Sequence, residues 1–205
     1  EGVDRGSRPS QQLAAEMIDA FLSAIERRRS TGERVTPDAL AQATCDAFER
    51  WGARRALVPD DAILHDAGVL DALRDAGIEV IVWPSDLGWR PLLGLDDAPA
   101  TCAITVPAVA VAQRGTVVLA ADSEHGRSLD AVGWWHLSIV PADRIVWSLG
   151  EAFARVFRDG APSAVSLVSG PSRTSDIEKI TTYGAHGALA EHVLVTDGPG
   201  GRSGG

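Results

Sequence analysis

Short apolar runs alternate with helical segments through the first half of the chain, and this alternation limits the possible folds more than any other feature. The runs cover residues 56–58, 69–76 and 78–83, and Gly77 provides the C-terminal stop of a helix before the last of them. Strands that alternate with helices predict parallel pairing in a sheet that is covered on both faces. We therefore expect this half of the chain to be α/β.

Two helices are expected ahead of this region. Apolar residues at helical spacing predict an amphipathic helix over residues 11–29, which closes on an arginine triplet at 27–29. Cations suit the negative end of the helix macrodipole, so the triplet is interpreted as a solvated helix end. Thr36 before Pro37 predicts the start of a second helix, which ends at Gly52.

Strands are expected to dominate the chain beyond residue 100. Their expected ranges are 102–106, 109–112, 116–120, 135–140, 165–168 and 193–196. A helix is expected over residues 144–158, where apolar side chains again recur at helical spacing. These elements favour a single α/β sandwich of Rossmann-like kind, preceded by the two helices.

The length of the chain sets its domain organisation. With 205 residues, the protein can bury a hydrophobic core without help from a disulfide or a metal. We expect one domain over residues 11–197, in which 11–52 hold the N-terminal helices and 53–197 the sheet core. The polar residues 1–10 and the glycine-rich residues 198–205 are expected to be a disordered leader and a disordered tail.

The charge balance bounds the partners of the protein. Its 19 basic and 28 acidic residues give a net charge of −9 and a pI of about 5.0. Such a balance argues against nucleic acid or an anionic membrane surface as a partner. No apolar run reaches the roughly 18 residues of a membrane-spanning helix and no signal peptide opens the chain, so a cytoplasmic protein is expected.

Several kinds of cofactor site lack their motif. The pattern G-x-x-x-x-G-K-[ST] does not occur, which excludes a Walker-type nucleotide triphosphatase at motif level. Cys45 and Cys102 lie far apart in apolar surroundings and match no metal-ligand spacing, so both are expected to be reduced thiols. The sequence therefore predicts no metal site and assigns no cofactor.

The stretch 169–178 says most about function. It follows the strand expected at 165–168, and Ser175 and Glu178 match a capping box. This pattern predicts a tight loop whose backbone amides point outward at a helix start, which is an arrangement that binds anions. The loop also lies beyond the carboxyl end of a strand, where open α/β sheets bind ligands. Two interpretations of this loop stay open: it is a ligand site, or it is a well-capped structural turn.

Side chains of two segments could complete such a site. Arg173 offers a planar guanidinium that suits a carboxylate or phosphate, and Ser172 and Thr174 offer hydroxyl donors. In the hairpin expected at 111–119, Gly115 permits a tight turn next to a threonine hydroxyl, although a plain hairpin is the alternative. The candidate ligand-binding residues are Gln113, Gly115, Thr116, Ser169, Gly170, Ser172, Arg173, Thr174, Asp176 and Glu178.

Histidines are the usual proton carriers near neutral pH. His186 lies in a glycine turn where a ligand could approach closely, and it is the candidate catalytic residue. The alternative is a structural histidine that is bonded to the backbone. His192, which follows Glu191 at a strand start, is expected at the surface, and the face on which His136 lies stays open.

Four segments share the pattern of a known family. They are AQRGTVVL at 112–119, SGPSRTSDIE at 169–178, YGAHG at 183–187 and EHVLVTD at 191–197. The last three resemble the closing signature of the lactate utilization protein C family, the LUD-domain proteins also called LutC/YkgG. The first resembles the hairpin block of the same family, and the resemblance extends over roughly residues 101–197.

The resemblance implies a three-layer α/β sandwich of the NagB/RpiA/CoA-transferase-like kind. It also implies participation in the oxidation of L-lactate to pyruvate, together with two partner proteins that carry iron–sulfur and redox machinery. The chain departs from the family pattern where Gln113 replaces an acidic residue, where Arg114 replaces a threonine, and at Ala108, near which the family has an aspartate. Because the closing signature is intact, anion binding is favoured over acid–base catalysis.

The leading hypothesis is an accessory subunit of a lactate-oxidising system. It would bind a small anionic metabolite at Ser172, Arg173, Thr174 and the turn at 115–116, with His186 as the candidate proton carrier. The alternatives are a standalone CoA- or nucleotide-dependent transferase or ligase of the same superfold and a non-catalytic regulatory relative. Whether the chain is an enzyme by itself stays open at this point.

Overall fold

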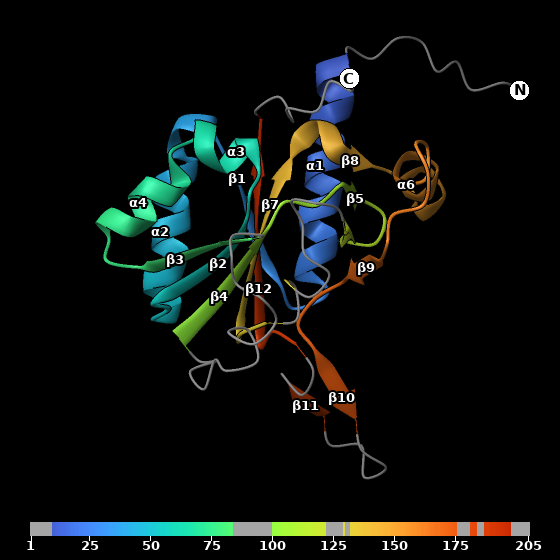
Figure 1. Ribbon diagram of the computed structural model, residues 1–205. Coiled ribbons are helices and arrows are strands. Elements are labelled where there is room, and N and C mark those ends of the chain that lie inside the picture. The colour runs from blue at the N-terminus through green and yellow to red at the C-terminus, as the bar shows by residue number, and fades with distance from the viewer. Residues whose placement is uncertain are drawn as a thin grey trace, which may run out of the picture.

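A computed structural model describes residues 10–83, 100–121, 129, 132–175, 181–183 and 187–197 (Figure 1). For residues 10, 11, 173–175 and 181–183 the description covers the backbone only. The helices in this part of the chain are α1 (Ser10–Glu26), the 3-10 helix η1 (Pro37–Ala39), α2 (Leu40–Trp51), α3 (Ala62–Asp66), α4 (Val69–Asp75), the 3-10 helix η4 (Ala142–Arg144) and α6 (Leu149–Val156). The strands are β1 (Thr31–Val35), β2 (Arg55–Pro59), β3 (Glu79–Trp83), β4 (Thr101–Thr105), β5 (Val109–Val111), β6 (Thr116–Ala120), β7 (Trp135–Pro141), β8 (Ile145–Val146), β9 (Val165–Val168), β10 (Arg173–Ser175), β11 (Thr181–Tyr183) and β12 (Ala190–Thr196).

The centre of the fold is a six-stranded sheet in the order β1-β12-β7-β4-β2-β3, and every neighbouring pair is parallel. Helices α2, α3 and α4 lie on one side of this sheet and α1 lies on the other (Figure 1). Parallel sheets need both faces covered, and their strands are accordingly rich in buried apolar residues. The predicted α/β class with a large parallel sheet is confirmed.

A second sheet of four strands, in the order β8-β5-β6-β9, lies beyond α1 (Figure 1). Its strands are mixed in direction, because β6 runs antiparallel to both β5 and β9 while β8 runs parallel to β5. Helix α1 buries Ile18, Phe21 and Ile25 in a core cluster that both sheets share. Helix α6 buries Ala152 against the outer face of the second sheet.

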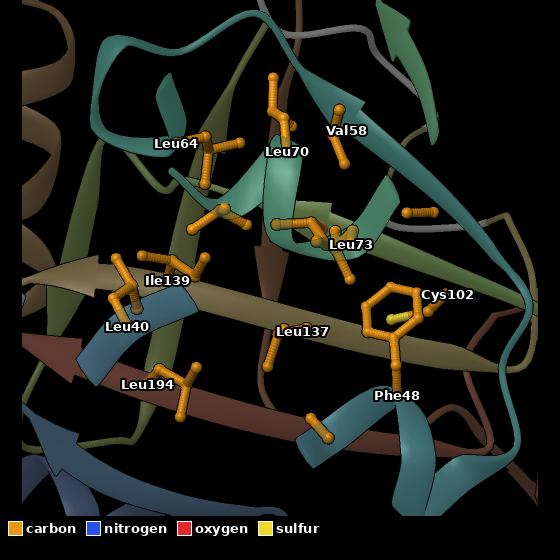
Figure 2. Close-up of a cluster of buried hydrophobic side chains, with 14 of the residues drawn as sticks. Leu40, Phe48, Val58, Leu64, Leu70, Leu73, Cys102, Leu137, Ile139 and Leu194 are labelled. Carbon is orange, nitrogen blue, oxygen red and sulfur yellow. The ribbon is translucent and has the colours of Figure 1, made fainter. Parts of the chain in front are cut away.

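The largest core cluster lies between the six-stranded sheet and helices α2 and α4. Figure 2 shows Phe48 of α2, Leu73 of α4 and Leu137 of the sheet within this cluster. Each of these three side chains is almost fully buried. Burying a leucine or phenylalanine side chain contributes roughly 1.5–3 kcal/mol, so this layer is a main source of stability.

Two segments near helix ends differ from the expectation. Strand β1 lies within residues 11–52, where only helices were expected, and it pairs with β12 at the edge of the large sheet. The helix expected over residues 144–158 is shorter, because Ile145–Val146 pairs with β5 and α6 begins only after Ser148. Ser148 is the actual helix cap, since its side chain accepts the N–H of Glu151.

The region around residue 170 also differs. Strand β9 has the predicted bounds, but it belongs to the four-stranded sheet and pairs antiparallel with β6. The expectation that the following loop leaves the carboxyl end of a strand in the parallel sheet was therefore wrong. The expected helix start at Ser175 was also wrong, because Ser175 ends strand β10 and pairs with Thr181 of β11 in an antiparallel hairpin.

Candidate functional site

The candidate site is built around residues 169–172, which we call the bend. The bend connects β9 to the hairpin β10–β11, which projects away from the two sheets (Figure 1). At its start, the hydroxyl of Ser169 lies 2.7 Å from the hydroxyl of Thr116 in β6. At its end, the N–H of Ser172 donates to the carbonyl of Ala188, 2.9 Å away. The structure thus brings together two segments that the sequence singled out separately.

Gly170 lies where the bend passes the end of α1. Its φ of 104° is a backbone conformation that residues with a side chain rarely adopt. A Cβ atom at this position would stand 2.8 Å from the carbonyl oxygen of Arg28, which is too close for any side chain. Glycine therefore allows the bend to pack directly on the chain that follows α1, with its N–H directed at the carboxylate of Glu191.

Glu191 is the centre of a buried polar network. Only 4% of this residue is exposed, and only 1% of His136, its register partner on the neighbouring strand β7. The hydroxyl of Ser30 donates to Oε2 of Glu191 at 2.6 Å, and Nδ1 of His136 lies 3.6 Å from Oε1. With the N–H of Gly170, the carboxylate has partners from three separate parts of the chain, as a buried charge requires.

Hydrogen bonds keep the Glu191 carboxylate ionised. Burial acts to raise the pKa of Glu191. The neighbouring imidazole of His136, the hydrogen bond from Ser30 and the N–H of Gly170 together outweigh burial and hold this pKa below its ordinary value. The site therefore contains a permanent internal anion at neutral pH, placed where the amides of the bend were expected to receive an external one.

The other ring nitrogen of His136 faces two hydroxyl groups. Its Nε2 lies 2.9 Å from the hydroxyl of Thr105 and 3.4 Å from that of Ser138. A hydroxyl, an imidazole and a carboxylate in this order also occur in nucleophilic catalysis. Here Thr105, His136 and Ser138 are each at most 2% exposed, so a substrate does not reach the Thr105 hydroxyl. The network acts inside the protein.

His192 lies on the opposite face of the same strand. The expectation that it is a surface residue was wrong: it is 3% exposed, because β12 is an interior strand of the large sheet. Its Nδ1 lies 2.7 Å from the hydroxyl of Thr31 and its Nε2 3.3 Å from Glu33. Burial and the charge of Arg50 lower the pKa of His192 against the opposing effect of Glu33. The ring is therefore neutral at pH 7.

The remaining predicted residues are placed as follows. Gln113 is exposed in the turn after β5, and its N–H donates to the carbonyl of Trp147 at 3.2 Å. Gly115, with a φ of 60°, packs against the backbone of α1 at Ala24 and Ile25. The backbones of Arg173 and Thr174 lie in β10, whereas Asp176, Glu178 and His186 lie outside the described residues.

Sequence reasoning missed Glu191, His136 and Ser30 as members of the site. A usable signal was present, because a glutamate and a histidine each stand at the second position of a strand that is buried on both faces. Buried charges are paired, so each implied a partner. The pairing of β7 with β12, which supplies that partner, is not visible in the sequence.

Metal and thiol chemistry are not indicated in the part of the chain that the structure describes. Within those residues, no group of three or more His, Cys, Asp or Glu side chains could hold a metal ion. Cys102 is fully buried, which raises the pKa of its thiol well above the ordinary value. Cys45 is half-buried, and burial together with the charge of Asp46 raises its pKa as well. None of the described helices is both long and apolar enough to cross a bilayer.

The fold and the network define an α/β protein with a parallel sheet and an internal anion beside a bend, and the sequence comparison specifies the family. The sequence model of the family described as LUD domain matches residues 16–196 of this chain. The chain therefore belongs to the LUD-domain family, which confirms the resemblance found in the sequence.

Several curated relatives carry the same name. Lactate utilization protein C of Geobacillus kaustophilus is 31% identical over 161 residues, which cover 72% of this chain and 65% of the relative. The protein of the same name from Geobacillus thermodenitrificans is 30% identical over 79% of this chain and 71% of its own length. The protein of this name from Bacillus subtilis is 27% identical over 77% of this chain and 69% of its own length. The match thus spans slightly less than two thirds of the first of these relatives.

A solved structure shares the fold. The crystal structure of a DUF162 family protein from Deinococcus radiodurans superposes with a TM-score of 0.64 at 23% sequence identity. The superposition covers 89% of this chain and 98% of the other. The arrangement of helices and sheets described above is therefore the arrangement of that protein as well.

Proposed function

We propose that this protein takes part in lactate utilization as an accessory subunit that binds a small anionic ligand beside the bend. The relatives named lactate utilization protein C support the process. The observation that supports the site is the 2.7 Å contact between the hydroxyls of Ser169 and Thr116, which joins two of the four segments of the family pattern. In this proposal, partner proteins with iron–sulfur centres accept the two electrons that lactate releases on oxidation to pyruvate.

The contacts of the bend support some candidate ligand groups over others. The N–H of Gly170 already interacts with the internal carboxylate of Glu191, so we do not include it among the groups that would bind an external anion. The ligand would therefore be recognised by the hydroxyls of Ser169 and Ser172 and by Arg173, which begins β10 directly after the bend. A guanidinium is suited to this role because it donates two parallel hydrogen bonds to a carboxylate or phosphate.

Titration calorimetry with lactate, pyruvate and phosphate-bearing cofactors tests this proposal. We expect one of these anions to bind, and we expect Arg173→Ala to weaken that binding about 10- to 100-fold, the usual effect of losing hydrogen bonds to a charged group. Arg74→Ala is the matched control, because Arg74 is an exposed arginine that pairs with exposed Asp71 on α4.

Two results would count against the proposal in different ways. Equal affinity in Arg173→Ala and the parent protein would exclude Arg173 as a ligand contact. Absence of binding for the whole set of anions, with and without the partner proteins, would exclude the ligand site itself.

A further inference from the structure

We propose that Glu191 is the positioning residue of the candidate site: its carboxylate fixes the bend and the end of α1 against the parallel sheet. The importance of this clamp for ligand binding rests on the proposed function. The clamp itself rests only on contacts within the chain, so the two ideas can fail separately.

The geometry shows how one carboxylate holds three segments. Ser30, which follows α1, is 161 residues away in sequence, and its hydroxyl donates to Oε2 at 2.6 Å. Gly170 of the bend packs on the carbonyl of Arg28, two residues before Ser30, and its N–H lies close enough to the same carboxylate to lower the pKa of Glu191. His136 on β7 lies beside Oε1 at 3.6 Å. The carboxylate projects from β12 of the large sheet, and it interacts both with the chain that follows α1 and with the bend.

The chain at the end of α1 is shaped to reach this acceptor. Arg29 has a φ of 66°, a left-handed conformation that is uncommon for residues other than glycine. Because of this turn, Ser30 enters the protein interior next to Glu191, and it is almost fully buried there. Gly170 in turn packs on the carbonyl of Arg28, so the end of α1 and the bend are in contact with each other as well as with Glu191.

The bend depends on this clamp because it belongs to neither sheet. It leaves β9 of the four-stranded sheet and enters the separate hairpin β10–β11. Its described anchors are the Ser169–Thr116 contact, the Ser172 N–H bond to Ala188 and the packing of Gly170 on the carbonyl of Arg28. At the third anchor the N–H of Gly170 also interacts with the carboxylate of Glu191, and interactions with a charged acceptor are the stronger kind. By fixing the bend, Glu191 therefore sets where strand β10 begins, and Arg173 is the first residue of that strand.

Amide hydrogen exchange measured by NMR tests the clamp directly. In the parent protein, the Gly170 amide should exchange slowly. In Glu191→Gln, which keeps the size of the side chain and removes its charge, we expect Gly170 to exchange about 10- to 100-fold faster. The amide of Leu137, in the core strand β7, should change much less, which separates loss of the clamp from general destabilisation.

Two further variants serve as controls. Glu33→Gln removes an exposed glutamate that contacts His192 on the opposite face of the sheet, and it should leave Gly170 unchanged. Ser30→Ala removes one donor but retains the charge, and Gly170 should stay protected within a few-fold. If Glu191→Gln does not fold, the parent protein alone still tests the clamp. Fast exchange of the Gly170 amide in the parent protein would overturn it.

The outcomes separate the clamp from the proposed function. Unchanged Gly170 exchange in Glu191→Gln would overturn the clamp, even if an anion binds in an Arg173-dependent way. Faster Gly170 exchange supports the clamp, even if no anion in the calorimetric set binds. If an anion does bind, Glu191→Gln should also weaken its affinity, and unchanged affinity would show that the clamp does not position the site.

Discussion

Replacing His136 with alanine is expected to lower the free energy of unfolding by about 3 kcal/mol, the upper end of the usual cost of leaving a buried acceptor without its partner. The substitution leaves the buried carboxylate of Glu191 without the imidazole that lies 3.6 Å away. His65→Ala is the matched control: His65 is half exposed and pairs with Asp60 at 2.8 Å, so its loss should cost less than about 1 kcal/mol. Urea unfolding at pH 7 measures both changes.

The effect of His136→Ala should also depend on pH. In the parent protein the pKa of Glu191 is lowered, so its contribution to stability is present above about pH 4.3, the ordinary pKa of glutamate, and is lost as pH falls through the lower folded value. Without His136, burial acts with less opposition and raises the pKa of Glu191. The variant should therefore recover part of its deficit as pH falls from 7 toward 5. A deficit that is constant over this interval would contradict an ionised Glu191.

Phe48→Ala is the second substitution with a large expected effect, a loss of about 3–5 kcal/mol. Phe48 is 1% exposed and projects from α2 into the cluster above Leu137 (Figure 2), so truncation leaves a cavity that helix and sheet cannot close. Phe153→Ala on α6 is the control, because Phe153 is 38% exposed and should lose about 1 kcal/mol or less. Equal midpoints of denaturation for the two variants would contradict the placement of Phe48 in the core.

Much of the fold was predictable because hydrophobic periodicity is local. The strand at 165–168 and the helix that ends at Gly52 were placed correctly from apolar spacing and a C-terminal glycine. Strand β1 was missed because its residues, Thr-Gly-Glu-Arg-Val, are mostly polar, and at the sheet edge only Val35 is buried. The sheet to which β9 belongs could not be predicted, since pairing with β6 depends on residues about 50 positions away.

Capping patterns show the same limit. Ser175 and Glu178 match a capping box, yet Ser175 lies in the hairpin β10–β11. Ser148 and Glu151 match the same pattern, and they do cap α6: the Ser148 hydroxyl accepts the N–H of Glu151, whose carboxylate accepts the N–H of Trp147 at 3.0 Å. The pattern alone does not distinguish the two cases, because strand pairing overrides a local preference for helix.

The candidate site was predictable in part. The glycine turn, the bend and their family pattern were found from sequence, and the structure places Thr116 against Ser169. The expectation that the bend binds an external anion stays a prediction, and the anion that the structure places beside the Gly170 amide is the carboxylate of Glu191. That this anion belongs to the protein could not be predicted, because it depends on the register that sets Glu191 beside His136.

NMR titration of the carbon-13-labelled Glu191 side chain is the most direct measurement of whether an ionised carboxylate holds the bend. The hydrogen bond from Ser30, together with the nearby imidazole of His136 and N–H of Gly170, predicts a single titration with a midpoint below the ordinary glutamate value, accompanied by a shift of the Gly170 amide resonance over the same pH range. A midpoint at or above the ordinary value, as burial alone would produce, or a Gly170 amide that does not respond, would contradict this arrangement.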